Sequence, residues 1–356
     1  MSSAELPVSE PGARFLDEIR EQPDALLRLV EREADFASVA EEMRSRGAIT
    51  VRMVGHGSSD NAASYGVYAF GLLPHWTALR DSISLSVYYG AELDMSGCTA
   101  LALSQSGQTP DVVEYLRHAR RRGAFTVALT NDPGSELARV ADAVIELHAG
   151  LERAVAATKT YSNQVAALGL LAAHAANEGV EFAEELRSAA EDIRQLVRSL
   201  ETRIAAVAMP FAYAGRMFVV GRGAEFATAR EIALKLLETC RVAAEPLTAT
   251  DLAHGPIAAL DSLFPIWAIA SNDATLPAVV EAVERAQEAG ATVIASGSAA
   301  DRIRGADYVL ASPRSSPLVA PLLSVVPGQL FAWALARARG LDPDAPRGLS
   351  KITLAR

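Results

Sequence analysis

Short apolar runs alternate with longer amphipathic segments along the first half of the chain. Five such runs predict strands at 49–54, 83–87, 99–103, 125–130 and 143–147. The segments at 60–73 and 110–122 have the pattern of helices. Strands that alternate with helices of about ten to fifteen residues are typical of a parallel sheet with helices on both faces. The predicted fold class is therefore α/β.

Two long stretches depart from this alternation. Residues 13–46 carry apolar side chains at the spacing of a helix with one buried face, after a Ser-, Pro- and Gly-containing arm at 1–12. Residues 159–208 also read as helical, and the strand–helix alternation starts again after them.

The second half of the chain repeats the first. Val54–Gly57 recurs as Val220–Gly223, 166 positions later, and Ala100–Thr109 aligns with Ile266–Thr275 at the same offset. A steady offset over about 90 residues indicates an internal duplication of one α/β unit. We therefore predict two tandem domains with this division: an arm and helix at 1–40, a first domain at 41–175, connecting helices at 176–210, a second domain at 211–340, and a tail at 341–356.

The loop after the strand that ends at Leu103 is a candidate anion site. Ser104, Ser106 and Thr109 surround Gly107, and Pro110 opens a helix with Thr109 at the N-cap position. The free N–H groups and the positive end of the helix dipole would face this loop and favour a phosphate. The alternative is a capped turn without a ligand.

The equivalent loop of the second copy lacks this chemistry. It reads Ala270–Thr275 and contains Asn272 and Asp273 where the first copy has serine and glycine. An added carboxylate repels phosphate, so the difference favours anion binding by the first loop alone.

Three charged residues share one stripe of the helix predicted at 224–239. Glu231, Lys235 and Glu238 stand at i, i+4 and i+7. They form either a solvated stripe stabilised by a Glu–Lys pair, or a carboxylate beside a lysine that faces a cleft as a general base. His254 lies in a turn, where it either only forms hydrogen bonds or moves protons near neutral pH.

Further candidates come from three other segments. Val155–Thr160 opens a helix that Thr158 could cap, and His56 lies between two glycines in a turn that could line a site. Lys351, near the carboxyl end, has the pattern of an ordinary surface residue when considered alone.

Composition narrows the class of protein. The chain has 356 residues, half of them hydrophobic, and a net charge of −10, which disfavours nucleic acid or an anionic membrane as a partner. Cys98 and Cys240 have no metal or redox spacing. The first residues lack a signal-peptide pattern, and the longest apolar run, 165–173, is too short to span a bilayer. We therefore expect a cytoplasmic protein.

Taken together, six segments in order resemble the sugar isomerase (SIS) family over roughly residues 40–356. The resemblance is to the two-domain isomerase half of glutamine–fructose-6-phosphate aminotransferase and to stand-alone amino-sugar-phosphate deaminases. The segments are Gly57–Asn61, Ser104–Thr109, Val155–Lys159, Ala233–Glu238, His254–Pro256 and Pro346–Lys351.

The resemblance implies a role for each matching residue. It implies that Glu238 moves a proton between C1 and C2 of the sugar, that Lys351 closes over the substrate, and that Lys235 supports the site. It implies that His254 assists ring opening from the neighbouring subunit, and hence a homodimer. It implies no metal or other cofactor. The residues that it implies for the 6-phosphate are Ser104, Gln105, Ser106 and Thr109, and those near the sugar are Ser59, Val155 and Ala156.

The chain also departs from the family pattern. Ala157 stands where the aminotransferases usually have serine, and Ser2 follows Met1 where their glutaminase domain presents a nucleophilic cysteine. We therefore expect no glutamine hydrolysis.

The leading hypothesis is an isomerase that deaminates glucosamine 6-phosphate or a close relative to the ketose phosphate and ammonia. The alternatives are a lyase or dehydratase that eliminates the C3 group of an N-acetylated amino sugar, and a sugar-phosphate-binding regulator without catalysis.

Overall fold

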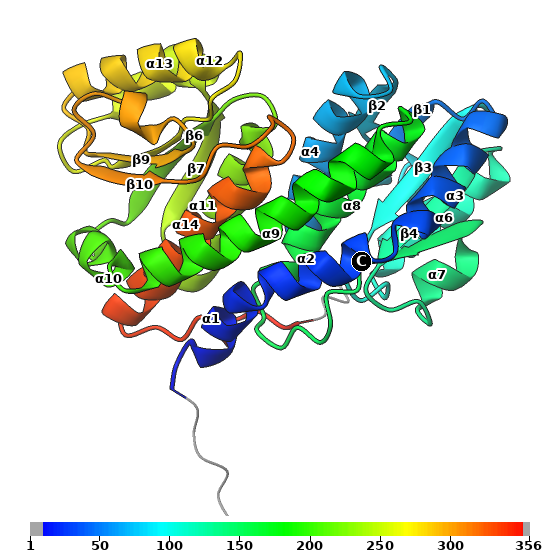
Figure 1. Cartoon of the computed structure of the whole chain (residues 1–356), viewed down its shortest axis with the longest axis horizontal. Helices are drawn as coiled ribbons and strands as arrows, with labels where there is room; N and C mark the ends of the chain where they lie inside the picture. The colour runs from blue at the N-terminus through cyan, green and yellow to red at the C-terminus, as the bar shows by residue number, and fades with distance from the viewer. Residues whose placement is uncertain (1–9, 352–356) are drawn as a thin grey trace, which may run out of the picture.

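Each half of the chain forms a five-stranded parallel sheet with helices on both faces, as shown by a computed structural model that describes residues 10–351 (Figure 1). The first sheet has the order β2-β1-β3-β4-β5. Its strands are β1 (Thr50–Val54), β2 (Thr77–Arg80), β3 (Cys98–Leu103), β4 (Phe125–Thr130) and β5 (Ala143–Glu146). The predicted α/β class is confirmed. Residues 1–9 of the predicted arm and 352–356 of the predicted tail lie outside the described range.

The second sheet repeats the first in order and register. Its strands are β6 (Arg216–Gly221), β7 (Ala243–Thr248), β8 (Ile266–Ile269), β9 (Val293–Gly297) and β10 (Tyr308–Ala311), in the order β10-β9-β8-β6-β7. Val54 pairs with Ala102 between β1 and β3, and Val220 pairs with Ala268 between β6 and β8. Both pairs are related by the offset of 166, so the structure confirms the duplication.

The predicted helical stretches are present but divided. Residues 13–46 form α1 (Ala13–Arg20), α2 (Gln22–Val30) and α3 (Glu33–Ser45). Pro23 lies in the first turn of α2, where a missing N–H is tolerated, and this accounts for the first break. The stretch 159–208 forms α8 (Lys159–Ala175), α9 (Gly179–Glu201) and α10 (Ile204–Ala208).

The remaining helices of eight or more residues are α4 (Ser58–Leu72), α6 (Pro110–Arg121), α11 (Glu225–Cys240), α13 (Leu276–Glu288) and α14 (Ala320–Ala338). Shorter helices are α7 (Glu136–Val140) and α12 (Ala249–Ala253).

The predicted strand at 83–87 is wrong. These residues form the short helix α5 (Ile83–Val87), whose buried side chains Ile83 and Ser86 lie three positions apart, on one helical face. An alternation over five residues is too short to separate the two structures. The strand that borders β1 is instead β2, which was missed because its half-exposed edge position carries no apolar run.

One large hydrophobic cluster spans both domains, and each domain also has a smaller cluster of its own. The helices that follow β1 and β6, α4 and α11, pack against each other, α8 covers α4, and α14 covers α11. The long helix α9 runs diagonally across both domains in Figure 1 and packs against α2, α8 and α14. The two copies therefore meet through equivalent helices, and the loops before α4 and α11 lie near this seam.

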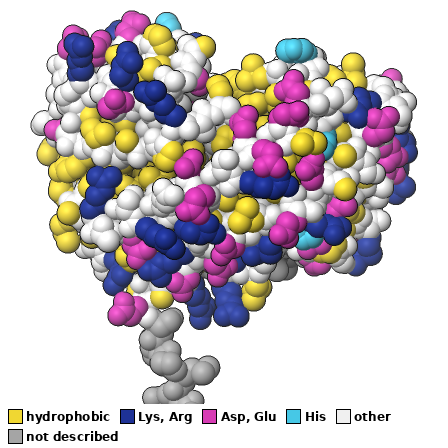
Figure 2. Space-filling view, in the orientation of Figure 1, with side chains coloured by type: hydrophobic (Ala, Val, Ile, Leu, Met, Phe, Trp, Pro, Cys, Tyr) yellow, Lys and Arg dark blue, Asp and Glu magenta, His cyan; other side chains and the backbone are white. Residues whose placement is uncertain are grey.

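The surface mixes charges of both signs. Figure 2 shows acidic and basic side chains interspersed over one face of the molecule. Within residues 10–351, no helix combines the length and the apolar character needed to cross a membrane.

Candidate active site

A cavity of about 400 Å³ opens where the loops after β1 and β3 meet the second domain and the carboxyl-terminal tail. In a parallel sheet the carboxyl ends of the strands are the usual place for a ligand. The cavity is lined by His56–Ser59, Leu103–Ser106, Thr109, Asp111, Val155, Ala157, Thr160, Gln164, Glu238 and Leu349–Lys351. Both domains therefore contribute to one site.

The hydroxyl-rich loop forms one end of this cavity. The Ser104 and Thr109 hydroxyls are 3.2 Å apart, and the N–H of Gly107 donates to Ser104 Oγ at 3.2 Å. Thr109 stands at the N-cap position of α6, as predicted, but its side chain makes no capping hydrogen bond. Gly107 has φ +60°, and a Cβ there would overlap the Ser135 side chain, so only glycine fits. The first turn of α6 thus lacks a side-chain cap and faces a loop of hydroxyls.

The equivalent position of the second domain is filled by the protein itself. Glu225 is buried and accepts hydrogen bonds from Thr228 and Ser324, each at 2.7 Å, and from Ser271. Burial raises the pKa of this carboxyl above its usual value. The open cavity therefore lies at the loop of the first copy, while its counterpart holds an internal carboxylate.

A buried ion cluster on α11 lies beside the cavity. Lys235 Nζ is 2.7 Å from Glu238 Oε2 and 3.3 Å from Glu231 Oε1. Ser58 Oγ and Asn61 Nδ2, both on α4, donate to the two Glu231 oxygens at 2.9 Å each. The side chains of Lys235 and Glu231 are 1% and 0% exposed, so the interpretation of a solvated stripe is wrong.

The cluster contains two carboxylates and one ammonium. Burial acts against the charge of Lys235, but the attraction of Glu231 and Glu238 outweighs it and holds the lysine pKa above its usual value. Burial raises the pKa of Glu231, and Lys235 offsets this only in part. Glu238, 22% exposed, is the member of the cluster that reaches the cavity. A carboxylate in this position can exchange a proton with a bound ligand.

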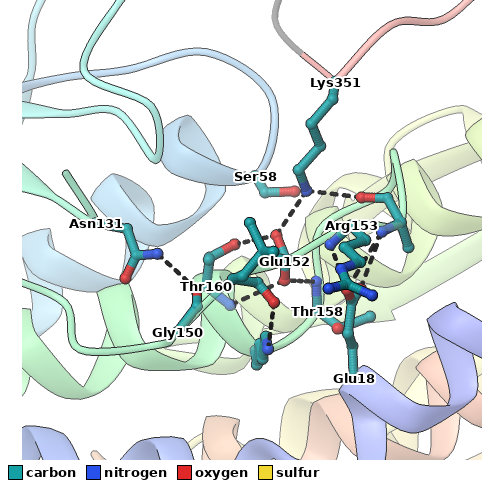
Figure 3. A network of polar contacts seen from close by, with 12 residues as sticks. Glu18, Ser58, Asn131, Gly150, Glu152, Arg153, Thr158, Thr160 and Lys351 are labelled. Carbon is teal, nitrogen blue, oxygen red and sulfur yellow. Dashed lines mark hydrogen bonds and ion pairs between the residues drawn. The ribbon is translucent and has the colours of Figure 1, made fainter. Parts of the chain in front are cut away.

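A second polar network includes Thr160 and Lys351, which line the cavity (Figure 3). Glu152, buried, accepts the N–H groups of Thr158 and Thr160 at 3.0 and 3.1 Å and the Thr160 hydroxyl at 2.6 Å. Thr158 occupies the N-cap position of α8 as predicted, but it does not cap the helix with its side chain; Glu152 accepts these N–H groups instead. Lys351 Nζ lies 2.9 Å from Glu152 Oε2. The surface position expected for Lys351 from its pattern alone is therefore wrong.

Glu18 on α1 binds the backbone of the loop that follows Glu152. Its carboxylate accepts the N–H groups of Arg153 and Ala154, the latter at 3.2 Å. Burial and the nearby charge of Glu152 raise the Glu18 pKa from 4.5 to about 7, although the two backbone hydrogen bonds act in the opposite direction. Neither Glu18 nor Glu152 lies in a recognisable sequence pattern, so neither is among the predicted site residues.

The raised pKa of Glu18 leads us to expect that this residue contributes to the free energy of unfolding in a pH-dependent way. Because its pKa is higher in the folded state, the folded state binds the proton more tightly, and this contribution is lost as pH rises from 4.5 to about 7. After allowance for solvent screening, the stability of the wild type relative to Glu18→Gln should fall by roughly 1–2 kcal/mol between pH 5 and pH 8. Urea unfolding of both proteins at the two pH values measures this. Asp17→Asn, on the same helix but exposed, should show no such trend; a pH-independent difference for Glu18→Gln would contradict the assignment.

The structure gathers most of the predicted site residues. Ser59, Ser104, Gln105, Ser106, Thr109, Val155, Glu238 and Lys351 all line the cavity, as does His56. Ser59 Oγ also accepts a hydrogen bond from Gln164 Nε2 at 2.9 Å. Ala156 is buried and its neighbour Ala157 lines the cavity instead. Lys235 does not line the cavity but contacts Glu238 and Ser58, which do. His254 is exposed and absent from the cavity wall of this chain.

Comparison with known proteins gives consistent matches over both domains. The family description "SIS domain" matches residues 42–174 and 211–338. The chain is 33% identical over 352 residues to glutamine–fructose-6-phosphate aminotransferase (isomerizing) of Thermococcus kodakarensis, covering 95% of this chain and 57% of that protein. For the same enzyme of Mycolicibacterium smegmatis the identity is 35%, with coverage of 95% and 56%. The chain thus spans a little over half the length of these relatives.

Among solved structures, the fold is similar to the C-terminal domain of glucosamine-fructose-6-phosphate aminotransferase from Francisella tularensis. The TM-score is 0.86 at 26% sequence identity, and the match covers 97% of this chain and 100% of that one.

Proposed function

The chain belongs to the SIS domain family, and from that premise we propose that it is a sugar-phosphate isomerase acting on an amino-sugar 6-phosphate. The proposed reaction converts glucosamine 6-phosphate and water to fructose 6-phosphate and ammonia. One observation carries the proposal: a single cavity is lined by the hydroxyl loop Ser104–Thr109 of the first domain and by Glu238 of the second.

The hydroxyl loop is the proposed phosphate site. Ser104, Ser106 and Thr109 offer hydroxyl groups, Gln105 a side-chain amide, and α6 its uncapped first turn. Together they can bind a phosphate without a lysine, because helix N-termini favour anions. The sugar then extends past Ser59 and Val155 toward Glu238 and Lys351. Ala156, which is behind the wall, contributes at most its backbone.

Glu238 is the proposed base for proton transfer between C2 and C1. In the open-chain aldehyde it removes the C2 proton. The electron pair forms the C1–C2 double bond while the C1–O π pair moves to O1, which takes up a proton, and an enolamine results. Return of the proton to C1 and loss of a proton from nitrogen leave a C2 imine. Water adds to this imine, and ammonia departs as the C2 ketone forms. Lys235 Nζ lies 2.7 Å from Glu238 Oε2 and so holds the carboxylate in a fixed position beside the cavity.

His254 is proposed to complete the site from a second copy of the chain. It is exposed here and lies outside the cavity, so an action on ring opening requires delivery by a partner subunit. We therefore propose that the active form is a homodimer.

An assay with three substrates tests the proposal. The purified protein is given glucosamine 6-phosphate, its N-acetyl form and galactosamine 6-phosphate, and ammonia and ultraviolet absorbance are followed. We expect ammonia from glucosamine 6-phosphate, at a rate at least about a hundred-fold lower for the Glu238→Gln variant measured in parallel. A new chromophore without ammonia would instead indicate elimination at C3, a possibility left open by Ala157 on the cavity wall. Binding of a sugar phosphate without turnover would indicate a regulator.

A further inference from the structure

Lys351 is held in place by two acceptors of one loop. Its ammonium lies 2.9 Å from Glu152 Oε2 and donates to the Ala154 carbonyl at 2.7 Å. Figure 3 shows the lysine pointing down from the tail between these two groups. The Ala154 N–H in turn donates to Glu18, so the loop that receives the lysine is itself fixed from below.

Glu152 is unusual as a partner because its charge is fully buried. Its side chain is 0% exposed, whereas that of Lys351 is 25% exposed. Burial alone would raise the Glu152 pKa, but Lys351, the Thr160 hydroxyl and the Thr158 N–H outweigh burial and hold the pKa below its usual value. The carboxylate is therefore ionised, and a buried ionised carboxylate attracts a cation more strongly than an exposed one does.

The tail that carries Lys351 is anchored at two points. Upstream, the Asp344 carboxylate accepts the N–H of Phe15 at 2.8 Å, and the Asp344 carbonyl accepts the N–H of Val155 at 3.1 Å. Downstream, Lys351 binds Glu152. Between these anchors, Leu349 and Ser350 form part of the cavity wall. The contact with Glu152 thus fixes the end of a strap that crosses the cavity.

We propose that Glu152 is the positioning residue for Lys351: it docks the tail lysine at the sugar end of the cavity and thereby closes the tail over the substrate. This inference rests on the proposed function for its catalytic consequence, but the docking itself does not. The N–H groups of Thr158 and Thr160 at the start of α8 already have Glu152 as their hydrogen-bond acceptor. The ion pair between Glu152 and Lys351 is therefore an additional contact and not part of helix capping.

A double-mutant cycle tests the inference in the full chain. Glu152→Gln and Lys351→Met should each lower kcat/KM for the amino-sugar phosphate on the order of ten-fold or more, since a hydrogen bond to a charged group is lost in each. Because Glu152 acts through Lys351, the double variant should be no worse than Lys351→Met alone. Additive losses would mean that Glu152 has a separate structural role and would overturn the proposal.

A matched control is available in the neighbouring lysine. Lys159 also binds one carboxylate, Glu21, and one loop carbonyl, Leu151, but Glu21 does not line the cavity. Glu21→Gln should therefore leave kcat/KM within about two-fold of the wild type, as expected for a partner that is half exposed.

Two measurements separate this inference from the proposed function. Acylation of Lys351 by an amine-reactive ester, followed by mass spectrometry, should be on the order of ten-fold faster in Glu152→Gln than in the wild type. Tryptic cleavage after Arg347 should be similarly accelerated in Lys351→Met, a variant in which Glu152 keeps its threonine donors. Unchanged rates in both would overturn the docking role even in an active enzyme. Accelerated rates in a protein inactive on every sugar phosphate would support docking and refute only the proposed reaction.

Discussion

A Glu238→Gln substitution is expected to lower kcat for the amino-sugar phosphate by about 10²–10⁴-fold, the usual contribution of a positioned general base. Glutamine has the shape of glutamate but cannot accept the C2 proton. KM should change little, because the hydroxyl loop that is proposed to bind the phosphate lies at the other end of the cavity. Steady-state kinetics of the purified variant measure both constants.

The fold of this variant should survive. Lys235 keeps Glu231 as its partner at 3.3 Å, and Glu238 itself is 22% exposed, so the substitution strands no buried charge. Thermal unfolding checks this point, and exchange of the C2 proton of the substrate with deuterated water gives a second readout, which should be lost together with turnover. A variant that retains more than about a tenth of the wild-type kcat would exclude Glu238 as the base.

Strands were easiest to predict from the sequence where their side chains are buried on both faces of the sheet. β3 and β4 are buried at every position and were read directly from their apolar runs. The edge strand β2 was missed and α5 was read as a strand, because half-exposed short segments carry no pattern that distinguishes the two. The duplication was visible because equivalent anchors kept one offset.

The burial and the partners of the charged residues at the site were harder to predict from the sequence pattern alone. A Glu–Lys–Glu stripe on a helix usually faces solvent, and nothing local to α11 shows that Ser58 and Asn61 approach it from the other domain. The resemblance to the SIS family indicated the importance of Glu238 and Lys351, but not the burial of Lys235. Glu152 and Glu18 were missed because their partners are backbone N–H groups and a lysine that is 199 residues away from Glu152.

Replacing Lys235 by methionine should have the largest effect on stability. Methionine fills a similar volume but leaves Glu231, 0% exposed, without its cation. Breaking a buried ion pair by removing one partner typically costs about 3–5 kcal/mol. Urea unfolding at pH 7.5 should therefore show a large loss of stability, and the loss should shrink as pH falls, because protonation of Glu231 removes the uncompensated charge.

Lys159→Met is the matched control for this variant. Lys159 is equally buried, but its carboxylate partner Glu21 is 52% exposed and can be hydrated after the lysine is removed. The loss of stability in Lys159→Met should therefore be much smaller than in Lys235→Met. The double variant Lys235→Met/Glu231→Gln should recover part of the lost stability, since neither charge remains in the interior between α4 and α11. If Lys235→Met were no more destabilising than Lys159→Met, the Glu231 carboxyl would have to be neutral in the wild type, and Lys235 would then owe its charge to Glu238 alone.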